Sequence, residues 1–327
     1  MPTRQQTHID KALTQISVAY MQDNATYVAD KVFPVIPVVK QSDRYFMYKK
    51  EDWFRDEAEE RALGTESAGG DYDIDNTPTY FCRKYAYHKD VFEEDRANSD
   101  DPLMPDQDAT EFVTDKLLLR REIAWATRYF STGVWGTEFA GISGADNVPG
   151  NQLKHWSDPN SDPIKHITDR ATDMQELTGK RPNKLVIGQR VFDALINHPD
   201  ILDRIKYTQR GIVSVDLLAA LFGVQSVLIA GAIKNTAVKG KSADMEFIMG
   251  KHALLCFTAA TPSLKTATAG YIFAWKGMLG ANAYGGRTLR IPVPLLGEGA
   301  ERIEGEIAWD MKVVASDLGA FFNGIVA

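Results

Sequence analysis

The chain has 327 residues, enough for one large domain or two ordinary ones, and 44% of them are hydrophobic and 25% charged. Its formal net charge of −7 excludes the broad basic surface of a dedicated nucleic-acid binder, so any contact with DNA is expected to be local and weak. Two cysteines and no apolar run of roughly 20 residues argue against a disulfide framework and a membrane-spanning helix.

The first 40 residues are expected to form an arm without a core of its own. Residues 1 to about 30 are polar and only weakly periodic, which is compatible with a short helix. The apolar segment 32–39 contains Pro34 and Pro37, which exclude a helix interior and a central strand. An exposed apolar segment is a liability for a monomer, so we expect a neighbouring subunit to cover it.

Residues 43–88 contain the most informative local pattern. The stretch 44–54 is rich in aromatic residues and predicts a strand, and 79–88 predicts a second strand with alternating faces. About two dozen charged and glycine-rich residues lie between them and cannot bury a core. The pattern predicts a long hairpin with a polar tip, whose aromatic strands need partners elsewhere.

Two acidic runs in this tip have alternative interpretations. The run 55–61 is either a solvated face or an inter-subunit salt-bridge patch, since an exposed pair contributes little unless a partner orders it. The segment 71–76 resembles half of a calcium loop. It lacks the glycine at the sixth position and the glutamate at the twelfth, where Cys82 stands, so no calcium site is predicted.

The longest predicted helix follows a linker at 96–105. No Gly or Pro interrupts residues 109–130, and Asp108 or Thr110 suits the N-cap. We predict a helix over about 108–131, six turns and on the order of 30 Å long. Its predicted apolar stripe contains Phe112, Leu119, Ile123, Ala126 and Phe130.

Three cations of this helix, Lys116, Arg120 and Arg121, are expected on its other faces. The sequence leaves three alternatives for what these cations contact: DNA phosphates, carboxylates of a neighbouring subunit, or solvent.

The second half of the chain predicts an α/β domain. Residues 133–162 are rich in Gly, Asn, Asp and Pro and are expected to form a loop. Helical patterns then alternate with short apolar runs. Helices are predicted at 163–178, 189–197 and 215–222, and strands at 184–187, 226–230, 247–249 and 253–258. The alternating tail 301–314 predicts one long strand.

No pattern of residues indicates a catalytic, cofactor or metal site. The sequence has no HExxH, CxxC, GxxxxGK[ST] or GxSxG motif. His155 and His166 flank an Asp-rich loop at 157–162 that imitates a metal site, and solvated loop polarity is the favoured interpretation. Cys82 and Cys256 are interpreted as small hydrophobic residues.

The order of these elements resembles the tailed-bacteriophage major capsid protein family with the HK97-like fold. The resemblance covers nearly the whole chain. It is carried by residues 85–130, in which YAYHKDVFEEDRANSDDPLM leads to DATEFVTDKLLLRREIAWATRYF, and by FPVIPVVKQSDRYFMYKKEDWFR at 33–55. It implies an α+β fold with an N-arm at 1–40, an extended E-loop at 41–84, a P-domain at 85–162 and 296–327, and an A-domain at 163–295.

The resemblance implies that the arm and the E-loop are covered by neighbouring subunits. The candidate inter-subunit contacts are Phe33, Val35, Ile36, Tyr45, Tyr48, Trp53, Phe54, Arg55, Glu57, Glu59, Arg61, Tyr80 and Arg83. The residues expected to define the spine helix of the P-domain are Phe112, Leu119, Arg120, Arg121, Ile123 and Phe130. Lys49 and Lys50 lie in the E-loop, but without an acceptor motif no isopeptide cross-link is predicted.

The resemblance also implies a function. A major capsid protein assembles through hexamers and pentamers into an icosahedral shell around double-stranded DNA. Other copies of the chain, a portal, a decoration protein and weakly held DNA are the expected partners, with no membrane. A separate scaffolding protein is expected because the chain lacks a long charged helical prefix. The expected location is the virion, after synthesis in the host cytoplasm.

Two alternatives remain open from the sequence. The first is an encapsulin-like nanocompartment shell, which has the same fold and encloses enzyme cargo. The second is a hydrolytic enzyme with a site around Asp158, Asp162 and His166, against which the missing motifs argue.

Overall fold

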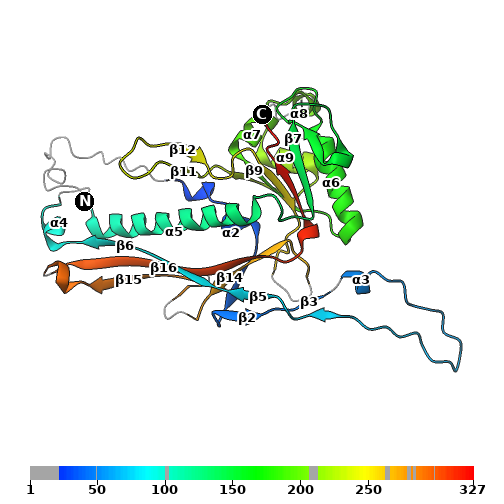
Figure 1. Ribbon diagram of the computed structural model, residues 1–327, viewed down its shortest axis with the longest axis horizontal. Helices are drawn as coiled ribbons and strands as arrows, with labels where there is room; N and C mark the ends of the chain where they lie inside the picture. Colours follow the sequence, from blue (N-terminus) through cyan, green and yellow to red (C-terminus); the bar gives the residue numbers. More distant parts are fainter. Residues whose placement is uncertain are drawn as a thin grey trace.

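A long helix and a long strand lie side by side in the computed structural model (Figure 1). Helix α5 (Pro105–Tyr129) packs along strand β16 (Glu301–Val313), and both lead to a thicker α/β unit at one end of the molecule. Helix α4 (Glu93–Ala97) lies at the opposite end. The described residues are 22–48, 50–99, 103–205, 213–261, 266–277, 281–282, 285–297 and 299–327.

Helix α5 begins three residues before its predicted start, with Pro105 in its first turn, where a missing N–H costs nothing. It approaches β16 closely because Gly305 has no side chain: a Cβ there would lie 2.6 Å from Cγ1 of Val113. The predicted apolar stripe was wrong in its first half. Phe112 is 42% exposed, whereas Ala109, Val113, Trp125 and Tyr129 are buried.

The long sheet has β16 at its centre. Strands β14 (Gly270–Trp275) and β15 (Gly286–Pro292) pair with one edge of β16, and β1 (Val35–Val38) pairs with β14 as an edge strand, as its proline requires. Strand β6 (Arg83–Val91) pairs with the other edge of β16 along its whole length. The prediction of one long strand at the C-terminal side is confirmed.

The α/β unit contains a six-stranded sheet covered by helices. The strand order is β10 (Ser226–Ala230), β9 (Lys184–Gly188), β13 (Ala253–Cys256), β17 (Gly319–Asn323), β7 (Thr137–Ile142) and β8 (Gln152–Lys154). The helices are α6 (Pro163–Thr178), α7 (Gln189–Ile196), α8 (Pro199–Ile205) and α9 (Val215–Phe222). The predicted helices and the predicted strands at 184–187, 226–230 and 253–258 are confirmed, while the strand predicted at 247–249 is β12, found two residues earlier.

Pairing between distant strands departs from the sequence expectations at two points. Residues 133–162 are not merely a loop, because β7 and β8 bring Phe139 and Leu153 into the core. The sheets also do not follow the predicted division of the chain. Strands β7, β8 and β17, expected with the spine helix, lie in the α/β sheet, whereas β14 and β15, expected in the α/β domain, pair with β16.

The predicted hairpin is present in short pieces. Strand β2 (Ser42–Arg44) pairs with β5 (Thr79–Phe81), and β3 (Met47–Tyr48) pairs with β4 (Ile74–Asp75). The single strand predicted over 44–54 is wrong, because Lys50–Trp53 turn into the short helix α3. A strand there would need a partner, and the chain opposite it consists of the polar tip.

The remaining elements are short. A second hairpin, β11 (Ile233–Asn235) with β12 (Met245–Phe247), projects from the α/β unit, and helix α2 (Ala29–Val32) lies against α5. Single 3₁₀ turns are η2 (Asn24–Thr26), η3 (Val148–Gly150), η4 (Pro294–Leu296) and η5 (Ser316–Leu318). None of the helices in the described ranges combines the length and apolar character needed to cross a membrane.

Candidate inter-subunit surface

The residues of the hydrolytic alternative all hold the fold together. His166 is buried, accepts a hydrogen bond from Nε1 of Trp156 (3.1 Å) at Nδ1, and contacts Asp146 Oδ2 (2.9 Å) through Nε2. Asp162 caps α6 by accepting from the backbone N–H of Lys165, and Asp158 accepts from the N–H of Asn160 within its turn. The three side chains therefore do not converge on a space where a substrate would bind.

The metal and thiol candidates have structural explanations too. In the part of the chain that the structure describes, no group of three or more His, Cys, Asp or Glu side chains is placed to hold a metal ion. In the segment that resembles a calcium loop, Asp75 accepts from both the N–H and the hydroxyl of Thr77. Cys82 and Cys256 are buried, and burial raises the pKa of each thiol to about 12, so neither is a reactive thiolate at neutral pH.

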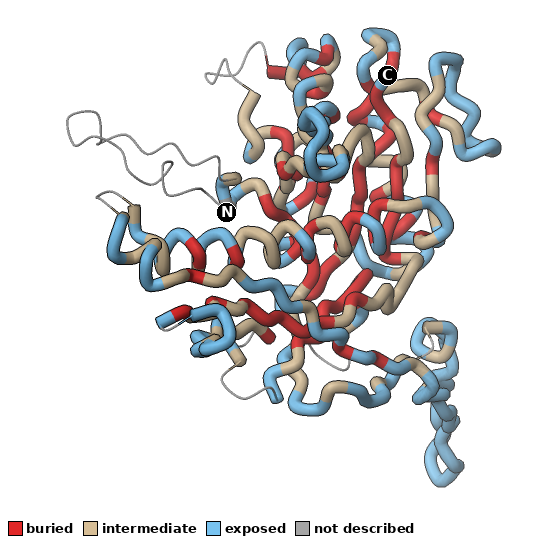
Figure 2. Tube along the Cα trace, turned by 60° about the vertical axis from the view of Figure 1, so that its left-hand side comes forward, coloured by how far each residue is buried: buried red, intermediate tan, exposed pale blue. Residues whose placement is uncertain are grey.

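The tip of the hairpin, residues 56–75, extends away from the rest of the molecule (Figure 2). Every residue of it is exposed except Asp75, which is half-buried. The tip contains eight acidic residues and one arginine, a net charge of −7 that equals the net charge of the whole chain. Such a segment buries nothing that would fix its conformation within its own subunit.

Aromatic side chains gather at the base of the tip. The rings of Tyr48, Trp53 and Tyr72 lie with their centroids 5.8–6.0 Å apart, although Trp53 is 59% and Phe54 66% exposed. Exposed aromatic rings that are already held in place are typical of contact surfaces, because little side-chain entropy is lost on binding. Arg55, Glu57, Glu59, Arg61 and Arg83 are exposed as well.

The same base is fastened to the α/β unit of its own chain. Lys50 forms an ion pair with Asp317, and the ring of Phe54 lies next to Gly179, where a Cβ would be 3.0 Å from Cζ. The base of the hairpin is therefore held in a fixed position, whereas its tip is exposed.

Other predicted contact residues are covered by their own chain. Phe33 is only 1% exposed and packs against Trp125, Tyr129 and Trp135, with ring centroids 4.6–6.3 Å away. Tyr80 is also buried and stacks on Phe273 at 4.6 Å. Helix and sheet partners distant in sequence cover these two side chains within their own subunit. Val35 is half-buried against the cluster that contains Phe33, and Ile36 and Tyr45 are half-buried against the cluster that contains Tyr80.

The segment before Phe33 is attached to α5 by polar contacts. The carboxylate of Glu122 accepts hydrogen bonds from the backbone N–H groups of Val28 and Ala29 (2.9–3.2 Å), and the hydroxyl of Tyr27 donates to Asp115 (2.9 Å). Burial raises the pKa of Glu122 although these donors act in the opposite direction. Arg121 is buried and paired with Asp30, which removes it from the cations that were candidates for binding DNA.

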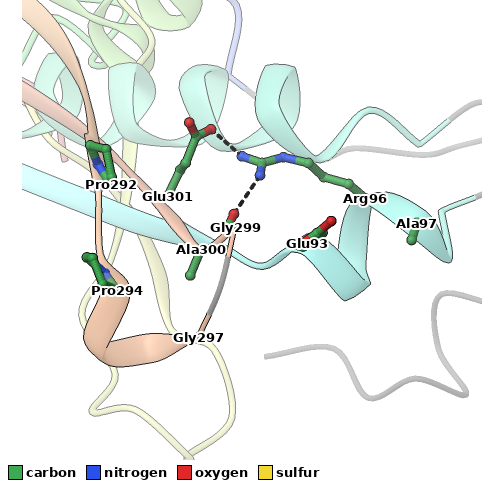
Figure 3. A pocket seen from close by; sticks show the side chains of 9 residues that line it. All are labelled: Glu93, Arg96, Ala97, Pro292, Pro294, Gly297, Gly299, Ala300 and Glu301. Carbon is green, nitrogen blue, oxygen red and sulfur yellow. Dashed lines mark hydrogen bonds and ion pairs between the residues drawn. The ribbon is translucent and has the colours of Figure 1, made fainter.

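The far end of the long sheet carries an open depression of about 710 Å³ (Figure 3). Arg96 contacts both carboxylate oxygens of Asp106 (2.8–3.1 Å), Glu301 (2.6 Å) and the carbonyl of Gly299 (3.0 Å), and Arg290 joins the same two carboxylates. The hydrogen bonds from Arg96 hold the pKa of Asp106 below its usual range. This network, which the sequence did not reveal, fastens α4 to the sheet.

Comparison with known proteins finds relatives of this chain among phage proteins. Residues 141–269 match the family model of phage major capsid protein E. The chain is 29% identical over 325 residues to the major capsid protein of Pseudomonas phage JBD67, covering 98% of this chain and 97% of that one. It is 28% identical over 226 residues, 69% of each chain, to the major capsid protein of Burkholderia phage BcepMu.

Solved structures show the same fold. A phage-related protein from Bordetella bronchiseptica superposes with a TM-score of 0.68 at 17% identity, covering 93% of this chain and 94% of that one. The mature capsid of bacteriophage PhiM1 gives a TM-score of 0.56 at 9% identity, over 97% and 91% of the two chains. An encapsulin from Synechococcus elongatus gives 0.50 at 11% identity, over 96% and 93%. In sequence the chain is similar to major capsid proteins of phages, and it has the HK97-like fold of the solved phage capsid structures.

Proposed function

We propose that copies of this chain assemble through hexamers and pentamers into the icosahedral head that encloses the double-stranded DNA of a phage. The observation that carries the proposal is the hairpin. Its base is fixed by Lys50 and Phe54, its aromatic rings are exposed, and its charged tip has no core. A segment of this kind is stabilised only by another molecule, and a shell provides that molecule at a fixed position.

The division of the subunit follows from the same proposal. The hairpin would serve as the E-loop that lies over a neighbour, the long sheet with α5 as the peripheral domain, and the α/β unit as the axial domain around five-fold and six-fold axes. The rigid base at α3 supports this assignment, since a loop that must reach a partner at one distance needs a fixed origin.

The other proposed partners act during assembly and packaging. A separate scaffolding protein would set the curvature of the shell, a portal would occupy one vertex, and a decoration protein would bind outside. Contact with DNA would be weak and non-specific, because the chain is acidic overall and packaged DNA has to leave again. Synthesis would take place in the host cytoplasm, before incorporation into the virion.

Negative-stain microscopy and gel filtration of the expressed chain test the proposal. The expected result is shells or ring-shaped capsomers, formed by the chain alone or after addition of its scaffold. A stable small monomer or dimer that never assembles under either condition contradicts the proposal. The nanocompartment alternative predicts shells with enzyme cargo, so the packaged contents separate the two functions. Both curated relatives are phage proteins, which favours DNA.

A further inference from the structure

The chain beyond β17, residues 324–327, runs between two loops of the α/β unit and lies in the upper part of that unit in Figure 1. The N–H of Ile325 donates to the carbonyl of Lys251 (3.0 Å), and the carbonyl of Ile325 accepts from the N–H of Trp156 (2.8 Å). Ile325 and Val326 are buried and belong to the core of the unit. We call residues 324–327 the strap, because they join the two loops.

A histidine ring holds the beginning of the strap. The N–H of Gly324 donates to Nδ1 of His252 (2.9 Å), and the ring also forms a hydrogen bond with the side chain of Asn323. The ring is half-buried and stacks on Phe321, with centroids 5.6 Å apart. A ring nitrogen that accepts a hydrogen bond carries no proton, so the contact with Gly324 requires neutral His252 with its proton on Nε2.

The surroundings of His252 provide no counter-ion for a charged ring. Strands β9, β13 and β17 adjoin its loop, and the one charged side chain among them is Lys184, at the far end of β9. The neighbour in the loop, Lys251, is a second cation. Among the described residues, no carboxylate lies within 4.0 Å of the ring nitrogens of His252. Burial lowers the pKa of His252, although the hydrogen bond with Asn323 acts in the opposite direction.

A second histidine acts on the strap through Trp156. Nδ1 of His166 accepts from Nε1 of Trp156 (3.1 Å), the residue whose backbone N–H holds Ile325. Nε2 of His166 contacts Asp146 (2.9 Å), and the same carboxylate accepts from the N–H of Lys154 (2.6 Å). A proton on Nδ1 of His166 would therefore be paired with Asp146 and would remove only the acceptor of an indole. A proton on Nδ1 of His252 would be unpaired and would face the strap itself.

We infer that acid releases the strap and that His252 is the group whose protonation releases it. Protonated Nδ1 is a donor that faces the N–H of Gly324, so two opposed donors replace the hydrogen bond. Release exposes Ile325 and Val326 and opens the core of the α/β unit. The long sheet, whose one histidine in the described strands is the exposed His88, keeps its pairing. The inference concerns the single subunit and does not rest on the proposed shell function.

Hydrogen exchange of the unassembled wild-type subunit measures the release, with rates corrected for the intrinsic effect of pH. Because the folded pKa of His252 is lowered, its contribution to stability is fully present above the unfolded value of about 6.5 and is lost as pH falls through the folded value. Between about pH 7.5 and about pH 5, protection of residues 319–327 should fall about tenfold more than protection of β16. Equal losses in the two segments, or no loss in either, overturn the inference.

Two replacements of His252 separate its charge from its hydrogen bond. His252→Asn keeps an acceptor oxygen that does not titrate, so protection of the strap should stay high at both pH values. His252→Leu removes the acceptor without adding a charge, so protection should be low at both. His88→Asn, on the exposed side of β6, is the matched control and should release the strap as the wild type does. Acid release that persists in His252→Asn overturns the assignment.

Trp156→Phe tests the second ring, because it removes the indole N–H that His166 accepts. Retained acid release in this variant assigns the release to His252, and lost release overturns that assignment.

Nuclear magnetic resonance of the histidine ring nitrogens in the wild-type subunit needs no variant, so it decides even where a variant fails to fold. At neutral pH, Nδ1 of His252 should have the chemical shift of an unprotonated acceptor. Its titration should have the same midpoint as the loss of protection in the strap. A ring that stays neutral while the strap opens overturns the inference.

Discussion

The segment 27–38 and the hairpin 42–81 are adjacent in sequence, and both were expected to be ordered by neighbouring subunits. The structure separates them. Contacts within the chain hold the first segment in place. Phe33 packs among aromatic rings, Glu122 accepts hydrogen bonds from two backbone N–H groups, and β1 pairs with β14. Contacts within the chain hold the hairpin only at its base. The difference teaches that of two extended segments of similar appearance, one can be part of the subunit's own core while the other is left exposed for the contact proposed above.

The largest effect is expected for the aromatic ring that anchors the first segment. Phe33→Ala removes a fully buried ring and should lower the free energy of unfolding by about 3–5 kcal/mol. Phe54→Ala, at an exposed ring of the hairpin base, should change it by less than about 0.5 kcal/mol. Urea denaturation of the unassembled subunits measures both. Similar values for the two variants would remove the distinction between the segments.

A smaller effect is expected at the polar attachment. Glu122→Ala leaves the backbone N–H groups of Val28 and Ala29 buried without an acceptor and should cost about 1–3 kcal/mol. Faster hydrogen exchange at these two amides should accompany the loss of stability. Glu111→Ala, an exposed position on the same helix, is the matched control. Unchanged exchange in Glu122→Ala would show that the carboxylate does not hold the segment.

The same carboxylate gives the attachment a pH dependence. Because burial raises the folded-state pKa of Glu122, its contribution to stability is fully present below the unfolded value of about 4.3 and declines as pH rises through the folded value. Glu122→Gln should remove this part of the pH dependence, as measured by urea unfolding between about pH 4 and 7. Identical pH profiles for wild type and variant would contradict the assignment.

The smallest effect on stability is expected for the tip. Replacing residues 57–71 with a short Gly-Ser linker keeps β3 paired with β4 and should change the free energy of unfolding by less than about 0.5 kcal/mol, because these residues bury nothing. Shell formation should nevertheless be lost. Normal particles from this variant would show that the hairpin is not required for assembly.

Local patterns in the sequence predicted the helices and strands whose ends or alternation are visible in neighbouring residues. The helices at 163–178 and 215–222 have a capping Asp162 or Ser214 at one end and a glycine of positive φ at the other. The residues next to each helix therefore define where it begins and ends. The long strand β16 shows its alternation directly.

Pairing and cover between distant residues were not predictable in the same way. Strand β7 pairs with β17, which lies about 180 residues later in the chain. Phe33 packs against rings of α5 that lie nearly a hundred residues away. The buried side of α5 was misjudged for the same reason, since β16, α2 and the α/β unit each cover part of it. The exposed hairpin could be found partly from the sequence, because the charge and aromatic content of 44–75 are local, while the ion pairs of Arg96 with Asp106 and Glu301 depend on elements brought together by folding.

Strand β17 occupies an inner position of the six-stranded sheet, between β13 and β7, and β16 is the centre of the other sheet. Both strands lie after residue 300. A nascent chain that has been translated only to residue 300 can close neither sheet, whatever the state of its earlier helices. Truncated products of interrupted translation therefore lack the central strand of one sheet and an inner strand of the other, and have no complete core.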